Sequence, residues 1–252
     1  MIEVSGLTKR YRELTAIEDL SFQVAKGEVL GFLGPNGSGK STTMRILTGF
    51  QPASSGTVKV AGFDVFEKPL EVKKRVGYLP EIPPLYPDMT VKAYLRFVAE
   101  LKGVPRKERA AEVDRVAQAT HVDGVMDRLI ANISKGYKQR VGIAQALLGS
   151  PEVLILDEPT VGLDPSQILE VRELIRSFRG KHTVILSTHI MQEVAATCDS
   201  VLVIARGQLR ARDSLQGLQD KHPGMSLEEI FLKLTSDLES PTPPPADESQ
   251  AA

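Results

Sequence analysis

The chain has one cysteine, Cys198, and almost no net charge, with 31 Lys and Arg against 32 Asp and Glu in 252 residues. A single cysteine excludes an internal disulfide. Because no charged, then apolar, then small-residue leader opens the sequence either, we expect a cytoplasmic protein. The balanced charge excludes an overall basic field, so we expect no nucleic-acid partner.

Long hydrophobic runs are also missing. The longest, such as Val153 to Leu156 and Val201 to Ala205, fall far short of the roughly 20 residues that cross a bilayer. The sequence therefore predicts that the chain does not span a membrane by itself. Its length allows one large α/β domain, or two lobes that share a core, without disulfides or structural metal.

The pattern of apolar residues changes along the chain. Short apolar runs bounded by Gly, Pro or charge predict strands near 2–4, 20–24, 28–33, 57–60 and 76–79. From Thr90 to Gly149 the apolar residues recur at three- and four-residue spacing, which predicts helices. We therefore expect a strand-rich first third followed by a helical lobe, about residues 82–149.

Strands return at Val153 to Leu156, Thr183 to Leu186 and Val201 to Ile204, with helical patterns at 167–178 and 191–197 between them. This alternation predicts a mostly parallel sheet. Arg206-Gly207-Gln208 predicts a hairpin turn, and we place the end of the main domain near residue 212. One further helix is indicated by Ser226 as its cap and Glu229 three residues on, within an extension at 213–238. Residues 239–252 are rich in Pro, Ser and charge and predict a disordered tail.

The segment Gly34-Pro35-Asn36-Gly37-Ser38-Gly39-Lys40-Ser41 has the spacing of a phosphate-binding loop. An apolar strand precedes it and a helical pattern follows it, so motif and context agree. The glycines allow a tight backbone curl whose N–H groups face phosphates at a helix N-terminus. Lys40 is expected to reach the β- and γ-phosphates and Ser41 to bind Mg²⁺. The alternative is a glycine-rich turn that only joins a strand to a helix.

A second motif is the apolar run Val153 to Leu156 followed by Asp157 and Glu158. In phosphate-loop proteins such a strand places its aspartate beside Mg²⁺ at the carboxyl edge of the sheet. We therefore assign Asp157 to the metal and Glu158 to the base that polarises the attacking water. Taken alone, the motif is equally consistent with a solvated strand end.

Several motifs in this order resemble those of the ABC ATPases. Ile133-Ser134-Lys135-Gly136-Tyr137 resembles their signature, and the run into Asp157-Glu158-Pro159-Thr160 resembles their Walker B region. Val161-Gly162-Leu163-Asp164 looks like their D-loop, and Ser187-Thr188-His189 looks like their switch histidine. The resemblance covers about residues 1–212. It implies an α/β fold of the P-loop NTPase class, in which a RecA-like, mostly parallel sheet carries an antiparallel β subdomain and an inserted α-helical subdomain.

The resemblance also implies the roles of individual residues. Tyr11 would stack on adenine, and the phosphate loop with Thr42 would hold ATP. Lys40, Glu158 and His189 would act on the γ-phosphate and the water, whereas Ser134 and Gly136 would act on the ATP of a second subunit. Asp164 of the D-loop is also expected to bind nucleotide. Family members work as homodimers or heterodimers on an integral membrane permease. We therefore expect peripheral attachment at the inner face of the cell membrane, with Pro83, Pro84, Leu85 and Tyr86 in the contact.

The sequence departs from the family pattern at two places. The usual Leu-Ser-Gly-Gly-Gln signature keeps only its serine and second glycine here, at Ser134 and Gly136. Glu81 stands where most members have a glutamine, and the resemblance implies that its carboxylate approaches Mg²⁺. Both departures are similar to those in bacterial drug, antibiotic, sodium and gliding-type exporters whose permease is a separate chain.

Three alternatives remain at this point. A soluble ABC ATPase of translation, DNA repair or cluster assembly would usually show two ATPase units, a coiled-coil insertion or zinc-binding cysteines. A P-loop GTPase or small-molecule kinase would show a guanine motif or a substrate lid. A nucleotide-binding regulator that no longer hydrolyses would not need intact Lys40, Asp157, Glu158 and His189.

Overall fold

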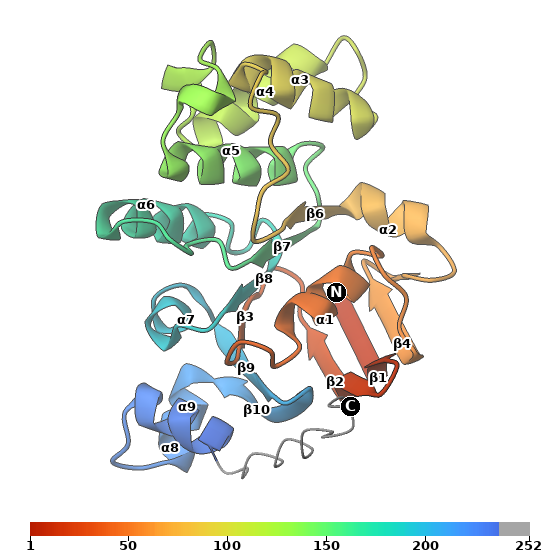
Figure 1. Ribbon diagram of the computed structural model, residues 1–252, viewed down its shortest axis with the longest axis vertical. Helices are drawn as coiled ribbons and strands as arrows, with labels where there is room; N and C mark the ends of the chain where they lie inside the picture. The colour runs from red at the N-terminus through yellow and green to blue at the C-terminus, as the bar shows by residue number, and fades with distance from the viewer. Residues whose placement is uncertain (237–252) are drawn as a thin grey trace, which may run out of the picture.

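A computed structural model describes residues 1–236 of the chain, so the predicted tail at 239–252 lies outside the described residues. Two sheets and a helical lobe make up the fold (Figure 1). The lobe of α3, α4 and α5 lies above the larger sheet, the smaller sheet lies to its right beside α1, and α8 and α9 lie at the lower end of the view.

The larger sheet has six strands in the order β10-β9-β3-β8-β7-β6. All neighbouring pairs are parallel except β9 and β10, which form the hairpin predicted at Arg206-Gly207. The prediction of a mostly parallel sheet is confirmed. Its strands are β3 (Val29–Leu33), β6 (Val76–Leu79), β7 (Val153–Asp157), β8 (Thr183–Thr188), β9 (Ser200–Ala205) and β10 (Gln208–Ser214).

The smaller sheet is antiparallel, with the order β2-β1-β4-β5. One face of β1 is buried and the other is exposed, because apolar and polar residues alternate along much of the strand. This is the expected antiparallel subdomain. Its strands are β1 (Ile2–Tyr11), β2 (Leu14–Val24), β4 (Ser55–Val60) and β5 (Phe63–Asp64).

Helices cover both faces of the larger sheet and form the lobe, which falls within the predicted range 82–149. Within residues 1–236 no helix has the length and apolar character needed to cross a bilayer. The helices are α1 (Lys40–Leu47), α2 (Pro69–Arg75), α3 (Val91–Leu101), α4 (Arg109–Ala119), α5 (Lys135–Leu147), α6 (Pro165–Arg176), α7 (Met191–Thr197), α8 (Leu215–Lys221) and α9 (Leu227–Ser236), with 3₁₀ turns at Asp123–Val125 and Ile130–Asn132.

The C-terminal extension holds two helices where the sequence predicted one. The predicted capping of α9 is present, because the Ser226 amide donates to the Glu229 carboxylate at 2.7 Å and the Glu229 amide donates back to the Ser226 hydroxyl at 3.3 Å. The helix that the sequence did not reveal is α8. It is seven residues long, contains Gly217 and buries only Leu218, so it shows no apolar period.

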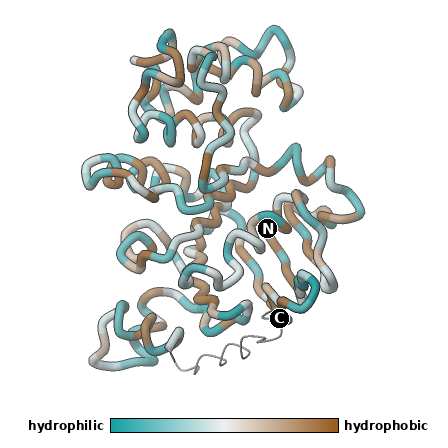
Figure 2. The backbone as a smooth tube through the Cα atoms, viewed as in Figure 1, coloured by the Kyte–Doolittle hydropathy of each residue, from teal (hydrophilic) through white to brown (hydrophobic). Residues whose placement is uncertain are grey.

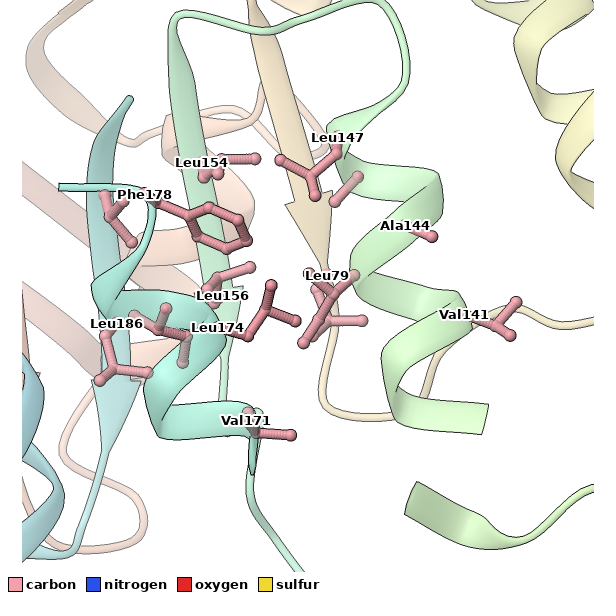
Figure 3. Packing of buried hydrophobic residues seen from close by; sticks show 14 of the residues in the cluster. Leu79, Val141, Ala144, Leu147, Leu154, Leu156, Val171, Leu174, Phe178 and Leu186 are labelled. Carbon is pink, nitrogen blue, oxygen red and sulfur yellow. The ribbon is translucent and has the colours of Figure 1, made fainter. Parts of the chain in front are cut away.

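Buried apolar side chains pack on both faces of the larger sheet. Figure 2 shows hydrophobic residues concentrated along the strands in the middle of the molecule. On one face α5 and α6 pack against β6 and β7 through Leu79, Leu147, Leu154 and Leu174 (Figure 3). The backbones of α5 and β6 come very close, because a Cβ at Gly77 would lie 2.2 Å from the Ala146 carbonyl oxygen. Only glycine fits there, and it anchors the C-terminal half of α5 to the sheet.

Candidate active site

The phosphate loop joins β3 to α1 in a curl that only glycine permits at two positions. A Cβ at Gly34 would lie 2.3 Å from the Ile204 carbonyl oxygen. Gly39 has a left-handed φ of 105°, and a Cβ there would lie 2.7 Å from the Ala16 carbonyl oxygen. Neighbouring backbone on both sides therefore fixes the shape of the loop.

The helix α1 begins directly at the end of this loop. Its N-cap is Gly39, and no side chain accepts a hydrogen bond from its first turn. The amides of that turn therefore keep their capacity to bind an anion, and the helix dipole adds partial positive charge there. The Ser38 hydroxyl is also buried and has no hydrogen-bond partner. The loop thus offers several polar groups without partners of their own.

The side chain of Lys40 is buried beneath the loop. Its ammonium donates to the carbonyl oxygens of Gly34 at 2.8 Å and Pro35 at 3.3 Å. It also lies 3.4 Å from Oε1 of Glu158, whose side chain is buried as well. The loop and the end of β7 are therefore linked by a buried ion pair.

The strands β3, β7 and β8 are neighbours in the sheet, so their carboxyl ends meet at one edge. At this edge Asp157 accepts a hydrogen bond from the Ser41 hydroxyl at 3.3 Å and a second one from the Ser187 hydroxyl. The adjacent positions of Asp157 and Ser187 follow from the register of β7 and β8. The sequence had placed Ser187 in the switch motif without giving it a role.

Glu158 and His189 follow β7 and β8 respectively, and their side chains meet. The His189 Nδ1 atom lies 3.2 Å and 3.0 Å from the two carboxylate oxygens of Glu158. Glu158 has a left-handed φ of 49°, which is unfavourable for a residue with a side chain. Its amide donates to the Ser187 carbonyl oxygen at 3.0 Å, so the loop after β7 is tied to β8.

These groups surround a cleft of about 530 Å³, a size suited to a nucleotide. Most of the residues predicted for the site line it: Tyr11, Asn36, Gly37, Gly39, Lys40, Ser41, Thr42, Glu81, Glu158 and His189. Tyr11 is 42% exposed, and its hydroxyl is hydrogen bonded to the Gln51 side chain. It is therefore available to stack on a flat ligand.

Three residues of the lining were not identified from the sequence: Leu14, Ala16 and Val161. Leu14 pairs with Tyr11 across the turn between β1 and β2, and its side chain is 67% exposed. An exposed leucine opposite an aromatic residue in a hairpin is a signal, but it becomes visible only once the hairpin register is known. Ala16 and Val161 carry no signal of this kind.

The signature residues lie away from the cleft of their own chain. Ser134 is exposed and caps α5, where its hydroxyl accepts from the Tyr137 amide at 3.3 Å. Gly136 is buried, and a Cβ there would lie 2.5 Å from the Gln167 side chain. Its absent side chain lets α5 approach α6. Neither residue belongs to the cleft lining.

Asp164, also predicted to bind nucleotide, caps α6. Its carboxylate accepts from the Gln167 amide at 3.0 Å and the Ser166 hydroxyl at 2.7 Å, and these bonds lower its pKa. The side chain is exposed and does not line the cleft. None of Ser134, Gly136 and Asp164 therefore lines the cleft of its own chain.

The donor set around Ser41 fits a hard divalent cation. A serine hydroxyl and a carboxylate meet at 3.3 Å, and the Glu81 carboxylate lines the same cleft. Within residues 1–236 no group of three or more His, Cys, Asp or Glu side chains is placed to hold a metal. Mg²⁺ typically needs only one or two carboxylates when phosphates and water complete its shell.

Comparison with known proteins agrees with this geometry. A family model described as "ABC transporter" matches residues 17–161. The ABC transporter ATP-binding protein NatA of Bacillus subtilis (strain 168) is 36% identical over 238 residues, covering 92% of this chain and 97% of that protein. The Nod factor export ATP-binding protein I of Paraburkholderia xenovorans (strain LB400) is 36% identical over 232 residues, covering 91% and 76% respectively.

A solved structure of the ATP-binding subunit of an ABC transporter superposes with a TM-score of 0.83 at 30% identity, covering 93% of this chain and 99% of that one. The region that matches the family model includes the phosphate loop, the helix α5 that follows Ser134, and Asp157 and Glu158 at the end of β7. Both the α/β P-loop fold and the ATP-binding role inferred from the sequence are thereby confirmed. The chain belongs to the ABC transporter family of ATPases.

Proposed function

We propose that this chain hydrolyses ATP as one half of a dimer and thereby drives export through a separate membrane permease. The observation that carries the proposal is the division of the site. Residues of the phosphate loop line one cleft together with Glu158 and His189, whereas exposed Ser134 belongs to another part of the surface. A second copy, or a close relative, would bring its Ser134 over the open side of the cleft.

Mg²⁺ belongs to this proposal. It would be held by Ser41 and Asp157 and would neutralise charge between the terminal phosphates. Glu81 is the third proposed ligand, because it lines the nucleotide cleft. In this arrangement Glu158 acts as the base, and Lys40 and His189 contact the γ-phosphate.

A second depression, here called the docking groove, supports a permease partner. It measures about 540 Å³ and contains two strongly exposed apolar side chains, Phe50 and Ile82, which are 75% and 83% exposed. The predicted contact residue Pro84 lines the groove as well. Large exposed apolar side chains around one depression are typical of an interaction site.

Tyr86, which the sequence also suggested for this contact, lies differently. Its ring packs against Tyr94 and Phe97 with centroid distances of 6.0 Å and 5.8 Å, so changing it would disturb the lobe. Ile82 is the better probe of docking because so little of it is buried. Glu81 lines both the docking groove and the nucleotide cleft, and so offers a direct link between permease and ATP.

The test compares Ile82→Asp with Leu232→Asp, a change at an equally apolar residue of α9 that is 61% exposed and outside the docking groove. We expect Ile82→Asp to release the chain from membranes that contain its permease while leaving soluble ATPase activity intact. Leu232→Asp should remain bound. Retained membrane association of Ile82→Asp would contradict docking through this groove.

Export, as the direction of transport, is proposed from likeness to proteins such as the Nod factor export subunit. The neighbouring reading frame provides a first check: a membrane protein with about six apolar spans supports the permease. The other candidate, a soluble ABC ATPase without a permease, would gain support if purification from detergent extract recovered no membrane protein. In the transporter case the chain lies at the cytoplasmic face of the membrane.

A further inference from the structure

One buried carboxylate of the described chain has no place in the roles assigned above. Glu193 lies in the first turn of α7 and is 1% exposed. No ion pair to it is found within residues 1–236; the recorded side-chain partners of its carboxylate are two threonine hydroxyls. Burying an ionised carboxylate without a cation is costly, so the site needs a reason to keep one.

The two threonines lie next to the two catalytic groups, Thr160 in the loop after β7 and Thr188 at the end of β8. Thr160, two residues after Glu158, donates to one oxygen of Glu193. Thr188, directly before His189, donates to the other oxygen at 2.7 Å. The Glu193 carboxylate therefore connects the ends of β7 and β8 through two hydrogen bonds.

Thr188 makes a further hydrogen bond next to His189. The Thr188 hydroxyl accepts a hydrogen bond from the Ile190 amide at 3.1 Å, so it holds the backbone on both sides of the histidine. The full path runs from the loop of Glu158 through Thr160, Glu193 and Thr188 to the loop of His189. The path forms a closed ring because His189 Nδ1 lies 3.0 Å from Oε2 of Glu158.

This closed arrangement matters because Glu158 is in a left-handed conformation, with φ of 49°. Such a conformation is unfavourable for a non-glycine residue, which keeps it only where its surroundings hold it. The Val161 amide donates to the Glu158 carbonyl oxygen at 3.3 Å, which completes a tight turn at this point. Thr160 lies in the middle of that turn.

We propose that Glu193 is a positioning residue for ATP hydrolysis, which fixes Glu158 relative to His189 through its hydrogen bonds to Thr160 and Thr188. The inference rests on hydrolysis at this site with Glu158 as the base, and it does not depend on a permease. Failure of the docking proposal would leave soluble ATPase measurements unaffected, so the two proposals fail by different observations.

A purely structural role for Glu193 makes a different prediction. An acid in the first turn of α7 also interacts favourably with the helix dipole, and its loss would lower stability alone. Positioning instead predicts a fall in kcat with little change in KM or nucleotide affinity, since the residue touches no nucleotide-binding group. The decisive measurement is therefore the separation of kcat from KM and from thermal stability.

The main variant is Glu193→Gln, which keeps the size of the side chain but replaces one of the two acceptor oxygens with an NH₂ group that cannot accept a hydrogen bond from a threonine. We expect kcat to fall roughly tenfold or more while KM changes less than about threefold. The matched control is Thr197→Val in the same helix. Thr197 is equally buried, and its hydroxyl donates to the Glu193 carbonyl oxygen at 2.6 Å, away from both catalytic loops.

Thr197→Val should lower the melting temperature and leave kcat unchanged. An equal loss of kcat in the control at the same loss of stability would overturn the proposal, as would unchanged kcat in Glu193→Gln. Combining Glu193→Gln with Glu158→Gln gives a further check. Residual turnover should not fall below that of Glu158→Gln alone, because there is no longer a base to position.

A second route applies even if Glu193→Gln does not fold. Thr160→Val removes one hydroxyl from the path, and Thr160→Ser restores it in a smaller side chain. We expect low kcat in the valine variant and recovery of most of the activity in the serine variant. Equal activity in the two variants would overturn the proposal.

Discussion

The ammonium of Lys40 lies 3.4 Å from the Glu158 carboxylate, and the two side chains are only 6% and 7% exposed. The group expected to bind the γ-phosphate thus forms an ion pair with the group expected to activate water. Each partner keeps the other from being a buried, unpaired charge. ATP would compete with Glu158 for Lys40 and release the carboxylate for catalysis.

This ion pair predicts a stability pattern in the nucleotide-free protein. Lys40→Met should lower the free energy of unfolding by about 3 kcal/mol, because it leaves Glu158 buried without its lysine partner. The double change Lys40→Met with Glu158→Gln should recover most of that loss. Urea denaturation measures both. Lys74→Met, which breaks the exposed pair of Lys74 with Glu71, serves as the control and should cost little. Strictly additive effects at Lys40 and Glu158 would contradict the coupling.

Glu158→Gln tests the assignment of the base. The amide cannot take a proton from water, so we expect hydrolysis to fall by about 100-fold or more while ATP binding is retained. Because bound ATP is not consumed, the variant should form a stable dimer with saturating nucleotide, as measured by light scattering. Full activity would reject Glu158 as the base, and a monomer with saturating ATP would reject the dimeric site.

Sharing of the site between subunits predicts rescue on mixing. Lys40→Met damages the cleft, whereas Ser134→Asp keeps the cap of α5 but places a negative charge toward the partner's phosphate. Each variant alone should be inactive. Random mixing gives heterodimers with one intact site, so activity should recover to about a quarter of wild type. Inactive heterodimers, once shown to have formed, would contradict independent composite sites.

Lys102 predicts a pH dependence of stability. Its ammonium donates to the Ala146 and Leu148 carbonyl oxygens, at 2.9 Å and 3.0 Å, at the end of α5. Burial lowers its pKa from 10.5 to about 8, although the nearby charge of Glu112 acts in the opposite direction. Between these two values the unfolded chain binds more protons than the folded chain, so the contribution of Lys102 to stability rises with pH.

The measurement compares wild type with Lys102→Met, so that other titrating groups cancel. The stability of wild type relative to the variant should rise by about 2 kcal/mol between about pH 8 and about pH 10. Below pH 8 the difference should level off. A difference that stays flat through this range would contradict the lowered pKa.

Much of the site could be predicted because its residues sit at the ends of short apolar strands. Gly34 to Ser41 follow β3, Asp157 ends β7 and Glu158 follows it, so a parallel sheet brings them to one edge wherever the rest of the chain lies. The contact of Lys40 with Glu158 could not be predicted. It depends on the left-handed backbone at Glu158, for which the sequence offers no glycine or asparagine as a signal.

The same reasoning explains what the sequence missed in the fold. The α2 and α8 helices are seven residues each and are held by neighbouring elements rather than by an apolar period. The role of Glu193 was also hidden. A glutamate in the first turn of a helix usually faces solvent, and only the packing of α7 against the sheet shows that it meets two threonines.

The close approach of α5 to β6 at Gly77 makes one end of that helix a pivot. With 13 residues the helix is about 20 Å long, and its other end carries Ser134 and approaches α6 at Gly136. A tilt of about 10° at the pivot would sweep Ser134 through roughly 3 Å, about the length of a hydrogen bond. If Ser134 meets the phosphate of a neighbouring subunit, as proposed, a tilt of this size would be enough to make or break that contact. The close packing at Gly77 would hold the other end of α5 in place.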